Sequence, residues 1–140
     1  MSAVPKMLCF TGLLLFLLGL LEAYFIPILA NPRLGVSAHT TGMQAGVALI
    51  AIGLLWPQLP LWQGWSAPIG YSLWISLYVV FAGMTFGAIW ATGRSLPIAG
   101  GGVPAQAWQE LVVRCLLAAG SIGTTVAIAA VLLQWCWPRA

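Results

Sequence analysis

Four long apolar runs leave this chain few ways to fold. They extend over about residues 7–29, 39–59, 68–92 and 108–137 of the 140 residues. A helix that spans the hydrocarbon core of a bilayer needs about 20 mostly apolar residues. Backbone polar groups cannot stay unpaired in lipid, so runs of this length are expected to be helical. The pattern predicts an all-α membrane protein: one domain, residues 1–140, folded as a four-transmembrane-helix bundle.

Composition excludes several other classes. Hydrophobic residues make up 61% of the chain and charged residues only 5%, whereas soluble domains carry about 25% charged residues. The net charge is +3, and the basic residues are scattered singly. Without a basic cluster to track phosphates, no nucleic-acid partner is expected. Cys9, Cys115 and Cys136 lack the spacing of a haem-attachment or zinc motif.

The even number of spans predicts that both termini lie on the same side of the membrane. The connections at about residues 30–38 and 93–107 then share the opposite side. Most ionisable groups gather at that second end: Glu22, Arg33, His39, Arg94, Glu110 and Arg114. Lys6 and Arg139 lie at the terminal end. The counts of basic residues leave the orientation open, and a bacterial inner membrane is the expected location.

Glu22 is an acid within an apolar run, about 12 Å below the end of its helix at 1.5 Å per residue. Acids at such depth are rare and usually face a bundle interior or a wet cavity. Glu22 is therefore interpreted either as a proton carrier or substrate contact, or as an ion-pair partner of Arg33, Arg94 or Arg114.

His39 is the only histidine of the chain, and we expect it at the start of the second helix. Helical geometry places Gly42, Gly46 and Gly53 close to its azimuth. Such a smooth strip has two interpretations. The glycines could let two helices approach closely, or they could leave room for a flat cofactor beneath an imidazole ligand.

Two further patterns occur in the third and fourth runs. Glu110 and Arg114 have the i, i+4 spacing of a helical ion pair. Tyr71, Trp74 and Tyr78 share one face of the third run and are either lipid-facing aromatics or the wall of a pocket.

Three motifs in order resemble the hydroxylaminobenzene mutase family. They are "FLLGLLEAYFIPILANPRLGVSAH" in the first half, "IWATGRSLPIAGGG" in the second, and the "QE" of Gln109 and Glu110. The match runs over nearly the whole chain and looks distantly similar to styrene oxide isomerases. The resemblance implies a small four-helix membrane isomerase. Its reaction would convert phenylhydroxylamine to 2-aminophenol, or an aryl epoxide to an aldehyde, without net redox change.

The resemblance also implies a cofactor and an assembly. Styrene oxide isomerases hold b-type haem between the subunits of a trimer, through a histidine that corresponds to His39. We therefore expect haem b as a Lewis acid, His39 as the metal ligand, a homo-oligomer, and a small apolar aromatic substrate from the lipid. The expected cofactor-binding residues are His39, Gly42, Gly46 and Arg94, and the expected catalytic residues are Glu22, Gln44 and Tyr78.

Several positions depart from the family pattern. The family has Glu two residues and Asn six residues after the histidine, where this chain has Thr41 and Ala45. Where the family has a Tyr-Ala-Asn step, this chain has Phe81, Ala82 and Gly83. Two alternatives therefore stay open: a haem-binding membrane protein without isomerase activity, or a small proton-coupled multidrug transporter that uses Glu22.

Overall fold

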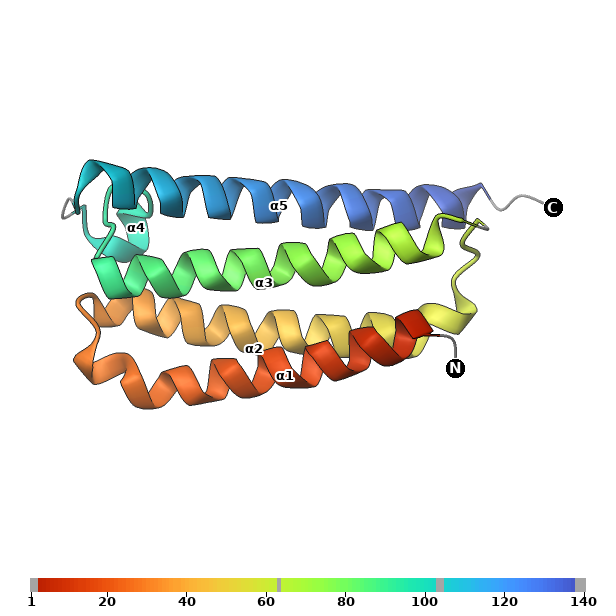
Figure 1. Ribbon diagram of the computed structural model, residues 1–140, viewed down its shortest axis with the longest axis horizontal. Helices are drawn as coiled ribbons and strands as arrows, with labels where there is room; N and C mark the ends of the chain where they lie inside the picture. The colour runs from red at the N-terminus through yellow and green to blue at the C-terminus, as the bar shows by residue number, and fades with distance from the viewer. Residues whose placement is uncertain (1–2, 63, 103–104, 138–140) are drawn as a thin grey trace.

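The computed structural model describes residues 3–62, 64–102 and 105–137 as a bundle of long helices (Figure 1). The long helices are α1 (Ala3–Phe25), α2 (Pro32–Leu55), α3 (Ser66–Trp90) and α5 (Ala107–Cys136). Each is long and apolar enough to cross a membrane, and the described residues form no strand. The predicted all-α membrane fold is confirmed.

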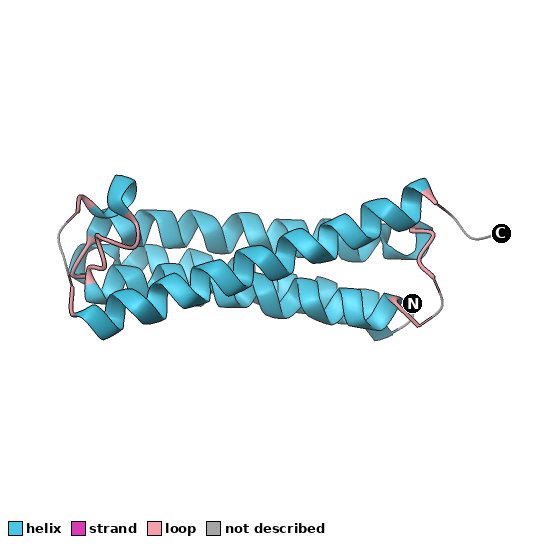
Figure 2. Cartoon of the chain, turned by 90° about the horizontal axis from the view of Figure 1, so that it is seen from above, coloured by secondary structure: helices cyan, strands magenta, loops and turns pink. Residues whose placement is uncertain are grey.

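The long helices alternate in direction along the chain. α1 packs mainly on α2 and α3 mainly on α5, while the contact between α2 and α3 joins the two pairs (Figure 1). The first turn of α1 and the last turn of α5 lie at the same end of the bundle (Figures 1 and 2). That both termini lie on one side of the membrane stays a prediction. Arg139, which was assigned to that end, lies outside the described residues.

The connection between α1 and α2 is much shorter than the sequence indicated. A 3-10 turn, Ile26–Ile28, continues α1, and α2 already begins at Pro32. Asn31 caps α2 by accepting a hydrogen bond from the Leu34 N–H at 3.3 Å, and proline suits the first helical position. The predicted loop over residues 30–38 is therefore wrong. His39 lies about 10 Å inside α2 rather than at its start.

Asn31 also fastens this turn to the other half of the bundle. Its side-chain amide donates to the Gly100 carbonyl at 3.0 Å, and its N–H donates to the Ala88 carbonyl at 3.0 Å. Gly100 ends α4 (Pro97–Gly100), a short helix that was not predicted within the connection at 93–107. The "ANPR" and "PIAGGG" segments, distant in sequence, thus meet at one end of the bundle.

Glu110 holds the connection between α3 and α5. Its carboxylate accepts from the Arg94 and Ala105 N–H groups at 3.1 and 3.2 Å, and from the Ser95 N–H at 2.7 Å. The Ser95 hydroxyl is a further partner. Arg114 is exposed. The interpretation of Glu110 as the ion-pair partner of Arg114 is wrong, because the loop backbone takes up its oxygens.

Glycines bring α1 and α2 into backbone contact. A Cβ on Gly42 would lie 2.9 Å from the Gly19 Cα, and one on Gly46 would lie 2.7 Å from the Gly12 carbonyl oxygen. Side chains of ordinary size would force the two helices apart. Of the two interpretations of this strip, close helix packing is the one that the structure displays.

The apolar core lies toward the terminal end of the bundle. It joins residues of all four long helices, including Leu8, Leu49, Leu73 and Ala127, each at most 2% exposed. The buried acids Glu22 and Glu110 belong to the other end, so the ionisable groups are segregated as the sequence indicated.

Gly46→Ala is expected to destabilise the bundle. The new Cβ would lie 2.6 Å from the Phe16 backbone nitrogen, and overpacking of this kind costs about 1–3 kcal/mol. Gly87→Ala is the matched control, because its Cβ would meet only side-chain atoms at 3.3 Å or more. Thermal unfolding in detergent should show a lower Tm for the first variant alone. Equal Tm values would contradict the backbone contact.

Glu110→Ala is expected to loosen the connection between α3 and α5. It removes the acceptor of three backbone N–H groups, which we expect to cost about 1–3 kcal/mol. Limited proteolysis should then cut faster within residues 93–106. Arg114→Ala should leave both proteolysis and Tm unchanged, whereas equal effects of the two variants would favour an ion pair.

Candidate functional site

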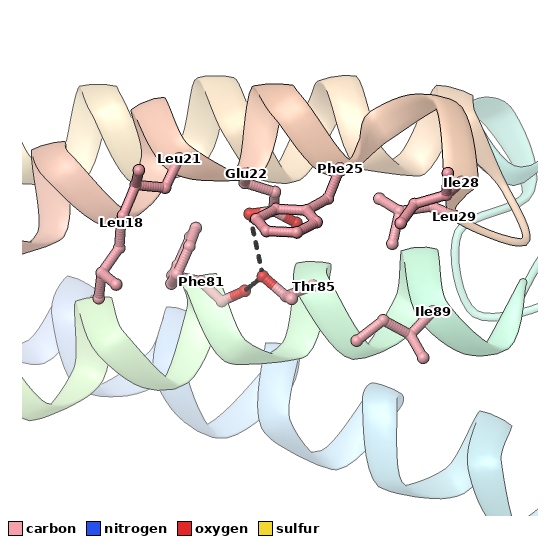
Figure 3. Close-up of a pocket in the computed structure, with 9 residues that line it drawn as sticks. All are labelled: Leu18, Leu21, Glu22, Phe25, Ile28, Leu29, Phe81, Thr85 and Ile89. Atoms are coloured by element: carbon pink, nitrogen blue, oxygen red, sulfur yellow. Dashed lines mark hydrogen bonds between the residues drawn. The ribbon is translucent and has the colours of Figure 1, made fainter.

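A pocket of about 470 Å³ opens between α1 and α3 near the end where their charged residues gather. Figure 3 shows Glu22 and Thr85 facing each other across it, with apolar side chains on either side. The lining residues are Leu18, Leu21, Glu22, Phe25, Ile28, Leu29, Phe81, Thr85 and Ile89. Most of the apolar members are exposed on the outside of the bundle. The pocket therefore opens toward the surface that lipid would cover.

Glu22 is the charged group of this pocket, and its side chain is only 7% exposed. Thr85 donates to Oε2 at 3.2 Å (Figure 3). Oε1 is buried and accepts no hydrogen bond from any residue that the structure describes. A buried acceptor without a donor is costly, so Oε1 is the unsatisfied atom of this site.

The arginines proposed as partners of Glu22 do not reach it. Arg33, Arg94 and Arg114 are all exposed, and the hydrogen bond to Glu22 within the described part of the chain comes from Thr85. The ion-pair interpretation of Glu22 is therefore wrong, and the interpretation as a proton carrier or substrate contact stays a prediction.

His39 lies across the interface between α1 and α2 from Glu22. Its Nδ1 is 2.7 Å from the Gly19 carbonyl oxygen, which can only accept, so Nδ1 carries the proton. Gly19 lies three residues before Glu22 on α1, so the imidazole lies within about one helical turn of the acid. Since Nδ1 is the donor, a neutral ring keeps its lone pair on Nε2, the state in which histidine ligates metals.

Gly42 and Gly46, expected to border a cofactor, are covered within the chain. A Cβ on Gly42 would lie 2.7 Å from the Phe81 ring, and one on Gly46 would meet the α1 backbone. Both glycines are buried. They present no open surface on this face, and they serve the site by letting α1 approach His39.

Gln44, Tyr78 and Arg94 lie away from the Glu22 pocket. Gln44 is exposed on α2 and lines a separate shallow groove with Met43 and Val47. Tyr78 donates to the Thr11 carbonyl at 2.8 Å, and Thr11 is about 16 Å from Glu22 along α1. The Arg94 side chain is exposed. Of the predicted site residues, the structure brings Glu22 and His39 together, with Gly42 packed beside them.

The aromatic residues on one face of α3 do not all fit the same interpretation, lipid-facing or pocket wall. Tyr71 is 48% exposed, as a lipid-facing residue would be. Trp74 and Tyr78 are half-buried and line a second, smaller groove beside α5. Neither belongs to the Glu22 pocket.

Thr41, Ala45 and Gly83, three positions that depart from the family pattern, do not line the Glu22 pocket either. Thr41 bonds its own helix through the Ser37 carbonyl at 2.7 Å. Ala45 is 6% exposed in the apolar core, and Gly83 packs against leucines of α5. The polar groups of the pocket are instead Glu22 and Thr85.

Sequence reasoning noted Phe81 only as a departure from the family pattern, and it did not identify Thr85. Thr85 lies in the third apolar run, where a threonine can satisfy its hydroxyl on its own helix, and it does so with the Phe81 carbonyl at 3.0 Å. Thr85 reaches Glu22 only because α3 packs on α1 and α2. Phe81 and Thr85 lie four residues apart, so they share one face of α3. If the first and third runs had been predicted to pack together, this spacing would have indicated which residues of the third run could face Glu22.

His39 is the one side chain proposed here as a metal ligand. The described residues include no group of three or more His, Cys, Asp or Glu side chains that could hold an ion. A haem iron needs only one or two protein ligands, because the porphyrin supplies the others. His39 fits haem ligation in two respects. Its tautomer leaves a lone pair on Nε2, and haem iron needs no more than one or two protein ligands.

Comparison with known proteins agrees with this architecture. A family model described as styrene oxide isomerase matches residues 5–136. Hydroxylaminobenzene mutase HabB of Ectopseudomonas oleovorans is 39% identical over 123 residues, which cover 86% of this chain and 74% of the relative. Hydroxylaminobenzene mutase HabA of the same organism is 41% identical over 108 residues, covering 76% and 80% of the two chains.

No solved structure matches the chain. The family model nevertheless extends over nearly all of the described helices, and the two mutases match most of the chain. This chain belongs to the styrene oxide isomerase family.

Proposed function

We propose that this protein is a membrane isomerase with hydroxylaminobenzene mutase activity. The observation that carries the proposal is a pocket of apolar residues around one buried acid, in a chain about 40% identical to two mutases. The substrate would be a small aromatic molecule with an N–OH group.

The pocket suits a substrate that dissolves in lipid. Its volume of about 470 Å³ falls within the range of small-molecule sites, about 300–1,000 Å³. Phe25 and Ile89 on its rim are 54% and 44% exposed. A substrate could therefore enter sideways between α1 and α3 without crossing water.

The proposed rearrangement needs no oxidant or reductant. In converting phenylhydroxylamine to 2-aminophenol, the N–O bond breaks and a C–O bond forms at the adjacent ring carbon. That carbon loses a proton and the nitrogen gains one. Glu22 is the acid of the pocket, and we propose that its carboxyl group carries this proton during the rearrangement. Thr85 would hold the carboxyl in place through Oε2.

We also propose that His39 binds haem b through Nε2. The hydrogen bond from Nδ1 to the Gly19 carbonyl supports this, because such a bond fixes the tautomer and orientation of a ligating ring. When bound, ferric haem would supply a Lewis acid that polarises the substrate oxygen. The chain's own contribution would be to orient His39 and to exclude water with the apolar walls of the pocket.

Homo-oligomerisation and a bacterial inner-membrane location stay predictions. The family match makes an isomerase a better-supported function than a proton-coupled transporter. A haem protein without isomerase activity is the remaining alternative, and the two experiments below separate it from the proposal.

The purified protein should convert phenylhydroxylamine to 2-aminophenol, measured by chromatography. Glu22→Leu should lower kcat by about 10²-fold or more, as loss of a general acid-base group does. Thr40→Ala is the control, since Thr40 is exposed and bonds only its own helix. Absence of product with the wild type, or equal rates in Glu22→Leu, would contradict the proposal.

The protein expressed with haem available should show a Soret absorption band. His39→Ala should lose the band, because the chain has no other histidine, while Thr40→Ala should retain it. A colourless wild type, or a band that survives in His39→Ala, would refute the ligand assignment. A haem band without turnover would favour the alternative function.

A further inference from the structure

We propose that the Glu22 pocket selects its ligand by hydrogen-bond donors and so favours arylhydroxylamines and related arylamines over aryl epoxides. The inference rests on the proposed function for the identity of the substrate. It goes further because it proposes that one atom, Glu22 Oε1, determines the choice between the two substrate classes of the family.

The first step is the unsatisfied state of that atom. Oε1 is buried and has no donor among the described residues. Of the nine residues that line the pocket, seven are apolar, and the eighth, Thr85, approaches Oε2 rather than Oε1. A ligand that carries an N–H or O–H group can therefore supply the missing donor.

Thr85 leaves Oε1 as a free acceptor in two protonation states of Glu22. Its hydroxyl lies 3.2 Å from Glu22 Oε2 and 3.0 Å from the Phe81 carbonyl oxygen, but it has one hydrogen. If Glu22 is ionised, Thr85 donates to it. If Glu22 is protonated on Oε2, it donates to Thr85, which donates to Phe81. In both cases Oε1 is an acceptor that lacks a donor, and these are the states in which we propose that the pocket selects its ligand.

His39 does not remove this need. Its Nδ1–H is committed to the Gly19 carbonyl at 2.7 Å, and in the neutral ring Nε2 carries a lone pair and cannot donate. The described structure contains no hydrogen bond between His39 and Glu22.

The two substrate classes differ in what they offer to Oε1. An arylhydroxylamine carries an N–H and an O–H, and 2-aminophenol also carries both kinds of donor. An epoxide oxygen only accepts, so it would leave Oε1 unpaired and face another oxygen. Sites built to bond a substrate O–H or N–H reject analogues that lack the donor.

Infrared difference spectroscopy can observe Glu22 directly. The sequence contains only two acidic side chains, Glu22 and Glu110, and Glu110 lies in the α3–α5 connection. The full-length protein in nanodiscs would be exposed in turn to 2-aminophenol, aniline and styrene oxide. Empty nanodiscs would correct for partition of each compound into lipid.

The expected result is a shift of a carboxyl band with 2-aminophenol and aniline but not with styrene oxide. The band should disappear in Glu22→Gln. An identical shift with styrene oxide, no shift with any compound, or a shift that persists in Glu22→Gln would overturn the proposal. The comparison of ligands in the wild type decides the matter even if the variant does not fold.

Turnover gives a second test. Glu22→Gln replaces an acceptor by an amide that can also donate, so the ratio of kcat/KM for phenylhydroxylamine to that for styrene oxide should fall by about tenfold or more. Ile89→Ala, which widens the pocket without changing its polar groups, should leave this ratio within about twofold. An unchanged ratio in Glu22→Gln would overturn the selectivity.

The failures of the two proposals are distinguishable. Ligand-dependent carboxyl shifts without any turnover would uphold donor selection and refute the proposed isomerase. Turnover of phenylhydroxylamine with no ligand-dependent change at Glu22 would uphold the isomerase and refute donor selection.

Discussion

The close approach of α1 and α2 through glycine is the constraint on which the rest of the structure depends. Gly19 lies against Gly42, and Gly12 lies against Gly46. In an antiparallel pair this register places Glu22, one turn beyond Gly19, across from His39, one turn before Gly42. It also brings the Gly19 carbonyl to the imidazole. A larger side chain on this strip would separate the acid from the histidine.

The end of the bundle that carries the ionisable groups is held by polar contacts rather than by a large apolar core. Asn31 joins the turn between α1 and α2 to Gly100, and Glu110 gathers three backbone N–H groups of the connection between α3 and α5. These residues belong to the segments on which the resemblance to the mutase family was recognised. In this structure, their common property is that they close one end of the helices around the Glu22 pocket.

The Glu22 pocket does not use three of the positions at which this chain departs from the family pattern. Thr41, Ala45 and Gly83 replace polar residues of the family pattern, and all three face packing surfaces or their own helix. The polar pair Glu22 and Thr85 lies between α1 and α3 instead. Glu22 has one oxygen without a hydrogen-bond partner, and in our proposal this oxygen makes the pocket prefer ligands that donate hydrogen bonds. An uncharged amide in its place would not give the same preference.

The sequence by itself determined the membrane class, the four spans, the segregation of the ionisable groups and the family. These depend on apolar run length and on motifs, which are local properties of the chain. It also identified Glu22 and His39, because an acid and a lone imidazole are conspicuous in so apolar a chain. It misjudged the start of α2, since Asn-Pro can begin a helix as readily as it can form a turn.

Only the tertiary structure decided which of these residues meet. The partner of Glu110 is a loop backbone and not Arg114, and the partner of Glu22 is Thr85 and not an arginine. Tyr78 and Gln44 were assigned to the site but point elsewhere. The physical reason is that contacts between helices depend on their rotation and register. In this chain the glycine strip sets both, and helical periodicity within one span cannot reveal which face of another span will cover it.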